Sequence, residues 1–192
     1  MKRHVWALAT TWLMTTQLTM AQDTEIQAYE RIKQIDSVEI RFYPSATLVT
    51  TSGGNNFGKL FQYISGNNKS NEKIAMTAPV YMNESKSEMA FVMPLSVHKK
   101  GAPLPKADHV SLQLTEPRYV AAIRYSGYTN SKKEATYKQK LLQTLKEHGI
   151  PAVGNVEILG YDSPYKFYNL SLIHISEPTR QAEISYAVFC LK

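Results

Sequence analysis

The 192-residue sequence has a single cysteine, Cys190, so no disulfide can form within the chain. It contains no G-x-S-x-G, P-loop or H-E-x-x-H motif, and no histidine has a cysteine or histidine partner at metal-site spacing. No arginine-rich stripe alternates with aromatic residues, so we expect no nucleic-acid partner. The composition, 43% hydrophobic and 20% charged, is typical of a globular domain held together by packing. No residue set argues for catalysis, so we expect a binding protein rather than an enzyme.

Apart from the N-terminus, no segment is apolar enough to enter a membrane. A basic start, Lys2-Arg3, precedes a mostly apolar run that ends in Thr19-Met20-Ala21. This layout predicts a secretory signal peptide over residues 1–21 and an exported protein, either periplasmic or secreted. A membrane anchor is the alternative, but several threonines within the run make it a poor bilayer span. We expect no stable membrane insertion once the signal is removed.

The rest of the chain repeats one order of elements. Residues 38–53 are extended by their alternation and interrupted by Pro44, and residues 110–127 repeat this pattern with Pro117. Both segments end in Ser-Gly and lead through a polar loop into an amphipathic helix. The stretch 95–107 is the expected connector between the halves. The repetition predicts an α+β domain with pseudo-twofold symmetry.

The two expected helices, near residues 57–64 and 131–148, share the string KLFQ in the first and KLLQ in the second. In the first helix, four apolar residues at i, i+3, i+4 and i+7 form one face: Phe57, Leu60, Phe61 and Ile64. Asn55 or Asn56 is the expected N-cap. Two strand-like runs follow this helix, KIAMTAPVYM and SEMAFVMP, and the strand NVEILGY follows the second helix.

Residues 71–80, NEKIAMTAPV, resemble the signature of the SOUL haem-binding protein family. EIRFYP, LFQYISGNN, AFVMP and ILGYDSPYKFYN match the family in order and spacing, so the resemblance covers about residues 29–169. It implies an α+β fold in which duplicated βαββ-type units form a distorted antiparallel β-barrel or sheet with two flanking helices. It also implies non-covalent binding of haem or another tetrapyrrole, without an established reaction.

The family pocket lies between the first helix and the loop before the last strand. Carried over to this sequence, it implies contacts from five residues: Phe57, Leu60, Phe61, Tyr161 and Lys166. Lys166 would pair with the anionic propionates of the ligand, and the aromatic residues would bury its macrocycle. The helix residues are equally suited to anchoring the helix in the core, so both roles stay open for them.

One position departs from the family. Some members carry a histidine in the E-I-R-x-Y strand that is proposed as an axial iron ligand, and here this position is Phe42. A phenyl ring cannot ligate iron, so we expect no metal site there and a pocket that accepts porphyrins generally. A general module for apolar or amphipathic small molecules is the alternative function. Acidic residues facing the pocket would favour a cationic ligand, whereas Lys166 favours an anionic one.

The end of the chain has a different character. Residues 170–180, LSLIHISEPTR, and residues 184–191, ISYAVFCL, resemble translated sequencing-library adaptor, and the three residues between them fit a short index. A genuine divergent strand is the alternative, because both blocks have β character. We therefore expect residues 22–169 to be the SOUL-like domain without its native last strand, and residues 170–192 to be a non-native tail.

Overall fold

A computed structural model describes residues 24–126, 130–161 and 170–176, the last of these by its backbone alone. The predicted signal peptide and the tail after Ser176 lie outside these residues. Within the described ranges, no helix has both the length and the apolar character needed to cross a membrane. Export and the domain boundaries at residues 21 and 169 therefore stay predictions.

The described elements follow the predicted duplication. The first half consists of β3 (Val38–Tyr43), β4 (Ala46–Ser52), α1 (Asn56–Ile64), β6 (Val80–Asn83) and β7 (Glu88–Val92). The second half consists of β8 (Val110–Thr115), β9 (Arg118–Ser126), α3 (Ser131–Glu147), β10 (Val156–Gly160) and β11 (Leu170–Ser176). The remaining elements are β1 (Glu25–Ile26), β2 (Glu30–Ile35), β5 (Thr77–Ala78) and a short helix α2 (Leu95–Lys100) in the predicted connector.

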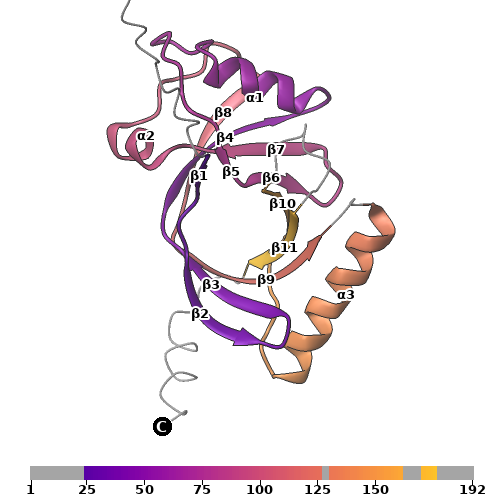
Figure 1. Cartoon of the computed structure of the whole chain (residues 1–192). Helices are drawn as coiled ribbons and strands as arrows, with labels where there is room; N and C mark the ends of the chain where they lie inside the picture. The colour runs from indigo at the N-terminus through magenta and orange to yellow at the C-terminus, as the bar shows by residue number, and fades with distance from the viewer. Residues whose placement is uncertain (1–23, 127–129, 162–169, 177–192) are drawn as a thin grey trace, which may run out of the picture.

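Nine strands form one antiparallel sheet in the order β2-β3-β9-β11-β10-β6-β7-β4-β8. The counterparts in the two halves are β3 and β8, β4 and β9, β6 and β10, and β7 and β11. Without β2, the order read from one end of the sheet matches the order of the counterparts read from the other end. The pseudo-twofold axis therefore passes between β10 and β6. This confirms the predicted α+β class and the duplication. The edge strands β2 and β8 do not pair with each other in the described part of the chain, so the structure is a curled sheet rather than a closed barrel (Figure 1).

Two prolines face each other at a gap between two strand pairs of the sheet. β3 pairs with β9 and β4 pairs with β8, and the register is the same on both sides of the gap. Pro44 therefore falls opposite Pro117. Proline has no N–H to donate, so the ladder is interrupted in both strands at one place and the ribbon can bend there. β3 and β9 lie near one end of the sheet, and β4 and β8 lie at the other end. The chain passes from one end to the other at this gap, and the sheet curls (Figure 1).

The curled sheet has an outer face covered by two helices. α3 packs on β9 and β11, burying Leu141 and Leu145 against Val38 and Ile123. α1 packs on β4, β7 and β8, burying Leu60, Tyr63 and Ile64 against Val49, Phe91 and Val110. β6 and β10 lie between the two helices (Figure 1). The two flanking helices expected from the family resemblance are therefore present.

The inner face is packed with small and aromatic side chains. Its apolar cluster is Ala46, Leu48, Tyr81, Ala90, Val92, Ala122 and Leu159, with Tyr161 packed against it. Successive strand residues point to opposite faces, so the charged residues that alternate with the outer core, Glu39 and Arg41, also point inward. The alternation of apolar and polar residues in β3 is typical of a strand whose polar face is in solvent, but Arg41 is only 1% exposed.

One local expectation was wrong: the run KIAMTAPVYM was expected to be extended from Lys73, but its strands begin at Thr77, because the Ile74 N–H donates to the Ile64 carbonyl and ties this segment to α1. Asn55, one of the two expected N-cap residues, is the N-cap of α1, but it is in a left-handed conformation, φ 50°, and its side chain makes no capping hydrogen bond. The connector contains the short helix α2, for which there was no sequence-based expectation.

Candidate functional site

α1 presents two of the predicted pocket residues at its surface. Phe57 is partly buried against Phe91, with ring centroids 5.4 Å apart, and its other ring neighbour is Phe61, at 6.0 Å and nearly parallel. The Phe61 side chain is 50% exposed. The predicted helix face included Phe61, but Tyr63 takes its place in the core at 1% exposure. Phe61 is therefore a large apolar residue that the fold does not need for packing.

Leu60 differs from its two neighbours. It is fully buried in the core between α1 and the sheet, together with Val49 and Val110. A ligand could reach Leu60 only if the helix moved. Of the three predicted helix contacts, the structure leaves Phe57 and Phe61 accessible and assigns Leu60 to the core.

The outer face of β6 and β10 continues the apolar surface away from α1. Val80 lies opposite Phe91 on one side and Gly160 on the other, and all three are on the same face of the sheet. Gly160 has no side chain to fill this strip, and Met82 approaches the position that its Cβ would take at 3.9 Å. β10 therefore ends two strands away from β7, whose Phe91 contacts Phe57 of α1.

Tyr161 is not brought together with the helix residues. It packs against the inner cluster with Leu159 and Tyr81, whereas α1 packs on the outer face. Lys166 lies outside the described residues, so its predicted pairing with propionates stays a prediction. The implied pocket is thus described in part, on its helix side.

Phe42 lies on the outer face of β3, with its ring 5.0 Å from that of Tyr119. Both are uncharged aromatic rings, and among the described residues no group of three His, Cys, Asp or Glu side chains is arranged to hold a metal ion. The iron ligand that some family members are proposed to have at this position has no chemical equivalent here.

Two ion pairs lie on the inner face. Nε and Nη2 of Arg41 contact Glu39 Oε2 at 2.7 and 2.6 Å, Nη1 donates to the Tyr43 hydroxyl at 3.2 Å, and the guanidinium lies 4.1 Å from the Tyr29 ring centroid. Desolvation lowers the pKa of Arg41, but Tyr43 and Glu39 outweigh it and the net pKa is raised. Arg41 is therefore a fixed buried cation with all its partners supplied by the protein.

The second ion pair joins Arg118 to Glu157, with Nη2 and Oε2 3.0 Å apart. Burial raises the pKa of the adjacent Tyr81, although the positive charge of Arg118 opposes this shift. The Tyr81 hydroxyl donates to Gln27 Oε1 at 2.7 Å. Gln27 and Tyr29 thus connect the segment after β1 to both inner ion pairs.

A groove of about 500 Å³ opens at one rim of the curled sheet. It is formed where β4 and β6 end and where β7, β8 and β10 begin. Its lining includes Leu48, Thr50, Tyr81, Met82, Asn83, Met89, Ala90, Ser111 and Gln113, and its acidic residues are Glu88, Asp108 and Glu157. This groove could not be predicted from the sequence, because its residues come from five strands and their ends, which only the register brings together.

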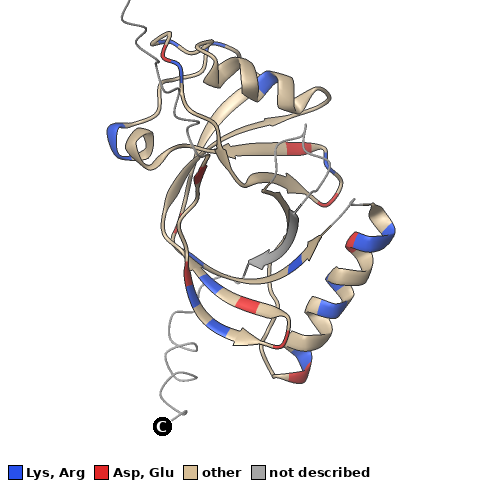
Figure 2. Ribbon diagram, in the orientation of Figure 1, with Lys and Arg blue, Asp and Glu red and all other residues tan. Residues whose placement is uncertain are grey.

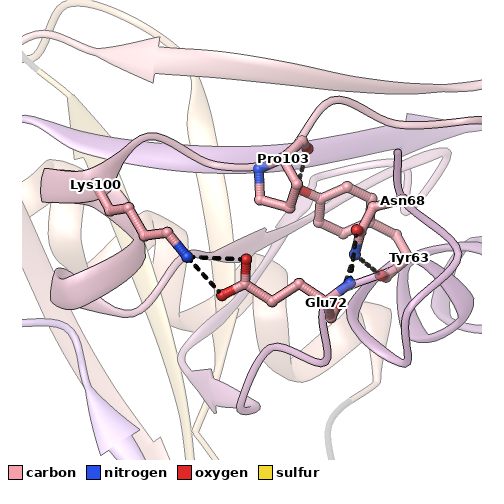
Figure 3. Close-up of polar contacts among 5 residues, drawn as sticks. All are labelled: Tyr63, Asn68, Glu72, Lys100 and Pro103. Carbon is pink, nitrogen blue, oxygen red and sulfur yellow. Dashed lines mark hydrogen bonds and ion pairs between the residues drawn. The ribbon is translucent and has the colours of Figure 1, made fainter. Parts of the chain in front are cut away.

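The loop that leads into NEKIAMTAPV is fixed by one buried side chain (Figure 3). Asn68 has no exposed surface; its Nδ2 donates to the carbonyls of Tyr63 and Glu72, and its Oδ1 accepts from the Glu72 N–H. The Tyr63 hydroxyl donates to the Pro103 carbonyl at 2.7 Å, and Lys100 pairs with Glu72. Burial raises the pKa of Tyr63 to about 12, with a further contribution from Glu72. This network joins α1, the signature loop and the connector.

Comparison with known proteins supports the resemblance. A family model described as SOUL heme-binding protein matches residues 24–170, and so ends where the adaptor-like tail begins. A human protein named heme-binding protein 2 is 30% identical over 173 residues, which cover 78% of this chain and 84% of that protein.

Two solved structures share the fold at 11% sequence identity. The C-terminal domain of EcmrR has a TM-score of 0.50, and the match covers 79% of this chain and 99% of that one. A hydrolase from Listeria innocua has a TM-score of 0.51, with 75% and 93% covered. At this identity the likeness shows the fold alone.

Proposed function

Because the chain belongs to the SOUL haem-binding protein family, we propose that it binds haem or a related tetrapyrrole and acts as a carrier, buffer or scavenger. The observation that carries this proposal is the aromatic pair on α1. Phe57 and Phe61 are stacked, and half of Phe61 is exposed although the core does not require it. A flat macrocycle that covers Phe61 would bury apolar area from both partners, at about 25 cal/mol per Å².

The ligand position that we propose lies on the outer face, beside Phe61 and the strip formed by Val80 and Gly160. Lys166, in the segment that follows this strip, supplies a cation for the propionates. Tyr161 has its side chain on the inner face, so in this proposal it anchors the segment instead of touching the macrocycle. With Phe42 in place of a ligating side chain, binding depends on apolar contact and charge, and iron contributes little.

Titration of the protein with haemin tests the proposal. We expect a shift of the Soret band that saturates, and we expect iron-free protoporphyrin to bind within about threefold of haemin, because Phe42 takes the position of the proposed axial histidine and cannot ligate iron. A titration without spectral change in a folded sample would contradict the proposed function. A strong preference for haemin would contradict the iron-independent mode.

Phe61→Ser identifies the site. We expect it to weaken haemin binding by about tenfold, because it removes a half-exposed aromatic surface while leaving the core intact. Leu142→Ser is the matched control: Leu142 is the residue of α3 that corresponds to Phe61 in the duplicated KLFQ and KLLQ strings, and it is 38% exposed. Equal effects of the two substitutions would place the ligand elsewhere.

We also propose that the protein is exported. The support is the layout of residues 1–21, and cleavage after Ala21 would leave three residues before β1, which begins at Glu25. Export is tested by determining the first residue of protein recovered from a secreting host. We expect Gln22, whereas an intact Met1 on the folded, recovered protein would contradict the proposal.

A further inference from the structure

The groove at the rim of the sheet is separate from the proposed tetrapyrrole position. Thr50, Ala90 and Glu157, which line it, belong to the inner face, whereas Phe61 is on a helix that covers the outer face. Met82 and Met89 are among the outer-face residues that the groove reaches at the strand ends, and Phe61 is not among its lining residues. Its volume of about 500 Å³ lies within the range of small-molecule pockets, roughly 300–1,000 Å³. The groove therefore has the size of a binding site and no role in the function proposed above.

The floor and the walls of the groove differ in chemistry. Leu48, Tyr81 and Ala90 form an apolar and aromatic floor, and these residues are buried. Hydroxyl and amide groups surround it: the Thr50 and Ser111 hydroxyls are hydrogen-bonded to each other at 2.8 Å, and the exposed Gln113 lies beside Ser111 on β8. An apolar floor with a ring of hydrogen-bonding groups suits a ligand that has one flat apolar part and one polar end.

The charged side chains that line the groove are acidic, and two cations at its edge are already bound: Arg118 to Glu157, and Lys59 to the carbonyls of Ser52 and Gly53. The described lining of the groove contains the carboxylates of Glu88, Asp108 and Glu157, together with His109, and contains neither lysine nor arginine. Glu157 is neutralised by Arg118, which leaves Glu88 and Asp108 as exposed carboxylates. Lysines lie along α3, outside the sheet, and further basic residues lie on β2, β3 and the connector (Figure 2). Negative charges at the mouth of a concave surface attract cations and repel anions.

We propose that this groove binds a small organic cation, with a flat apolar part on the floor beside Tyr81 and a protonated amine between the carboxylates of Glu88 and Asp108. A tetrapyrrole is excluded from this site by its anionic propionates. The two binding activities are therefore independent, and this one does not require that the protein bind haem.

Two probes of the same shape and opposite charge test the proposal. Tryptamine and indole-3-propionate share an indole ring on a short chain, but one ends in an ammonium and the other in a carboxylate. In calorimetric titrations of the full-length protein, we expect tryptamine to bind at least tenfold more tightly, and we expect added salt to weaken it. No binding of tryptamine at millimolar concentration, or equal binding of both probes, would overturn the proposal.

The double variant Glu88→Gln, Asp108→Asn identifies the carboxylates. Both side chains are exposed, so the fold is kept, and we expect tryptamine to bind about tenfold more weakly. Glu147→Gln, on the distant end of α3, removes a carboxylate from the surface outside the groove and should change nothing. A loss of the same size in this control would show general attraction to the surface and refute the site. Haemin binding should be the same in the double variant, in Glu147→Gln and in the unsubstituted protein.

Discussion

At the scale of single residues, Arg41 shows what alternation in a sequence does not reveal. The residues VEIRFY alternate between apolar and polar, and such a pattern predicts a strand with one face in water. In the curled sheet the polar face turns inward, and Glu39, Tyr43 and Tyr29 satisfy the guanidinium there. The pattern identified the strand and its two faces correctly. It could not show the burial of Arg41, which depends on the curvature of nine strands.

Asn68 is a second residue whose role needed the structure. Asn68-Lys69-Ser70 fits the glycosylation sequon, and nothing in the sequence favours a structural role for Asn68. Both hydrogens of its Nδ2 are donated to carbonyls and the side chain is fully buried. In the folded protein this nitrogen is therefore not accessible to a glycosyltransferase.

We predict that Asn68→Ala lowers the free energy of unfolding by about 3 kcal/mol, because two carbonyls and one N–H lose their partner without access to water. Asn67→Ala is the control, since the neighbouring Asn67 is exposed and is held in the turn by its backbone N–H. Urea unfolding of both variants measures the difference. A loss in Asn68→Ala no larger than in Asn67→Ala would show that this network does not stabilise the fold.

At the scale of elements, most of the architecture could be predicted because the two halves of the sequence repeat the same order of elements. Pro44 and Pro117, the paired Ser-Gly ends and the KLFQ and KLLQ strings gave the duplication, and the sheet order confirms it. The register that sets the two prolines opposite each other could not be predicted, because it depends on long-range pairing. For the same reason the sequence placed Tyr161 beside the helix residues, whereas its side chain belongs to the other face.

β11 is the element whose sequence and position disagree most. Its residues 170–176 begin the stretch that we expect from the sequence to be a non-native tail, yet its backbone pairs with β9 on one side and β10 on the other. Backbone hydrogen bonds do not depend on side-chain identity, so many extended segments can occupy this position. The strand thus marks the place that a last strand fills in this fold.

We predict that a chain ending at Asn169 loses cooperative unfolding, because β9 and β10 are then separated by an unfilled strand position. A chain ending at Ser176 keeps all of β11 and should unfold as the full-length protein does. Urea unfolding followed by circular dichroism compares the three proteins. Cooperative unfolding of the shorter chain would mean that β9 and β10 can pair without β11.

At the scale of the whole molecule, the two faces of the sheet divide its proposed activities. The outer face carries the aromatic pair and the proposed tetrapyrrole, and the inner rim carries the acidic groove. Family resemblance could identify the first activity, because its residues lie in contiguous motifs. It could not identify the second, because the residues of the groove are distributed over five strands and form no contiguous motif.

The central position of β11 also bears on how the protein is made. A ribosome delivers residues 170–176 after every other strand of the sheet, yet these residues lie between β9 and β10. Until they emerge, the position between β9 and β10 has no strand to fill it. Pairs that do not involve β11, such as β3 with β9 and β4 with β8, can form earlier, but the continuous sheet is completed only after residues 170–176 have been synthesised.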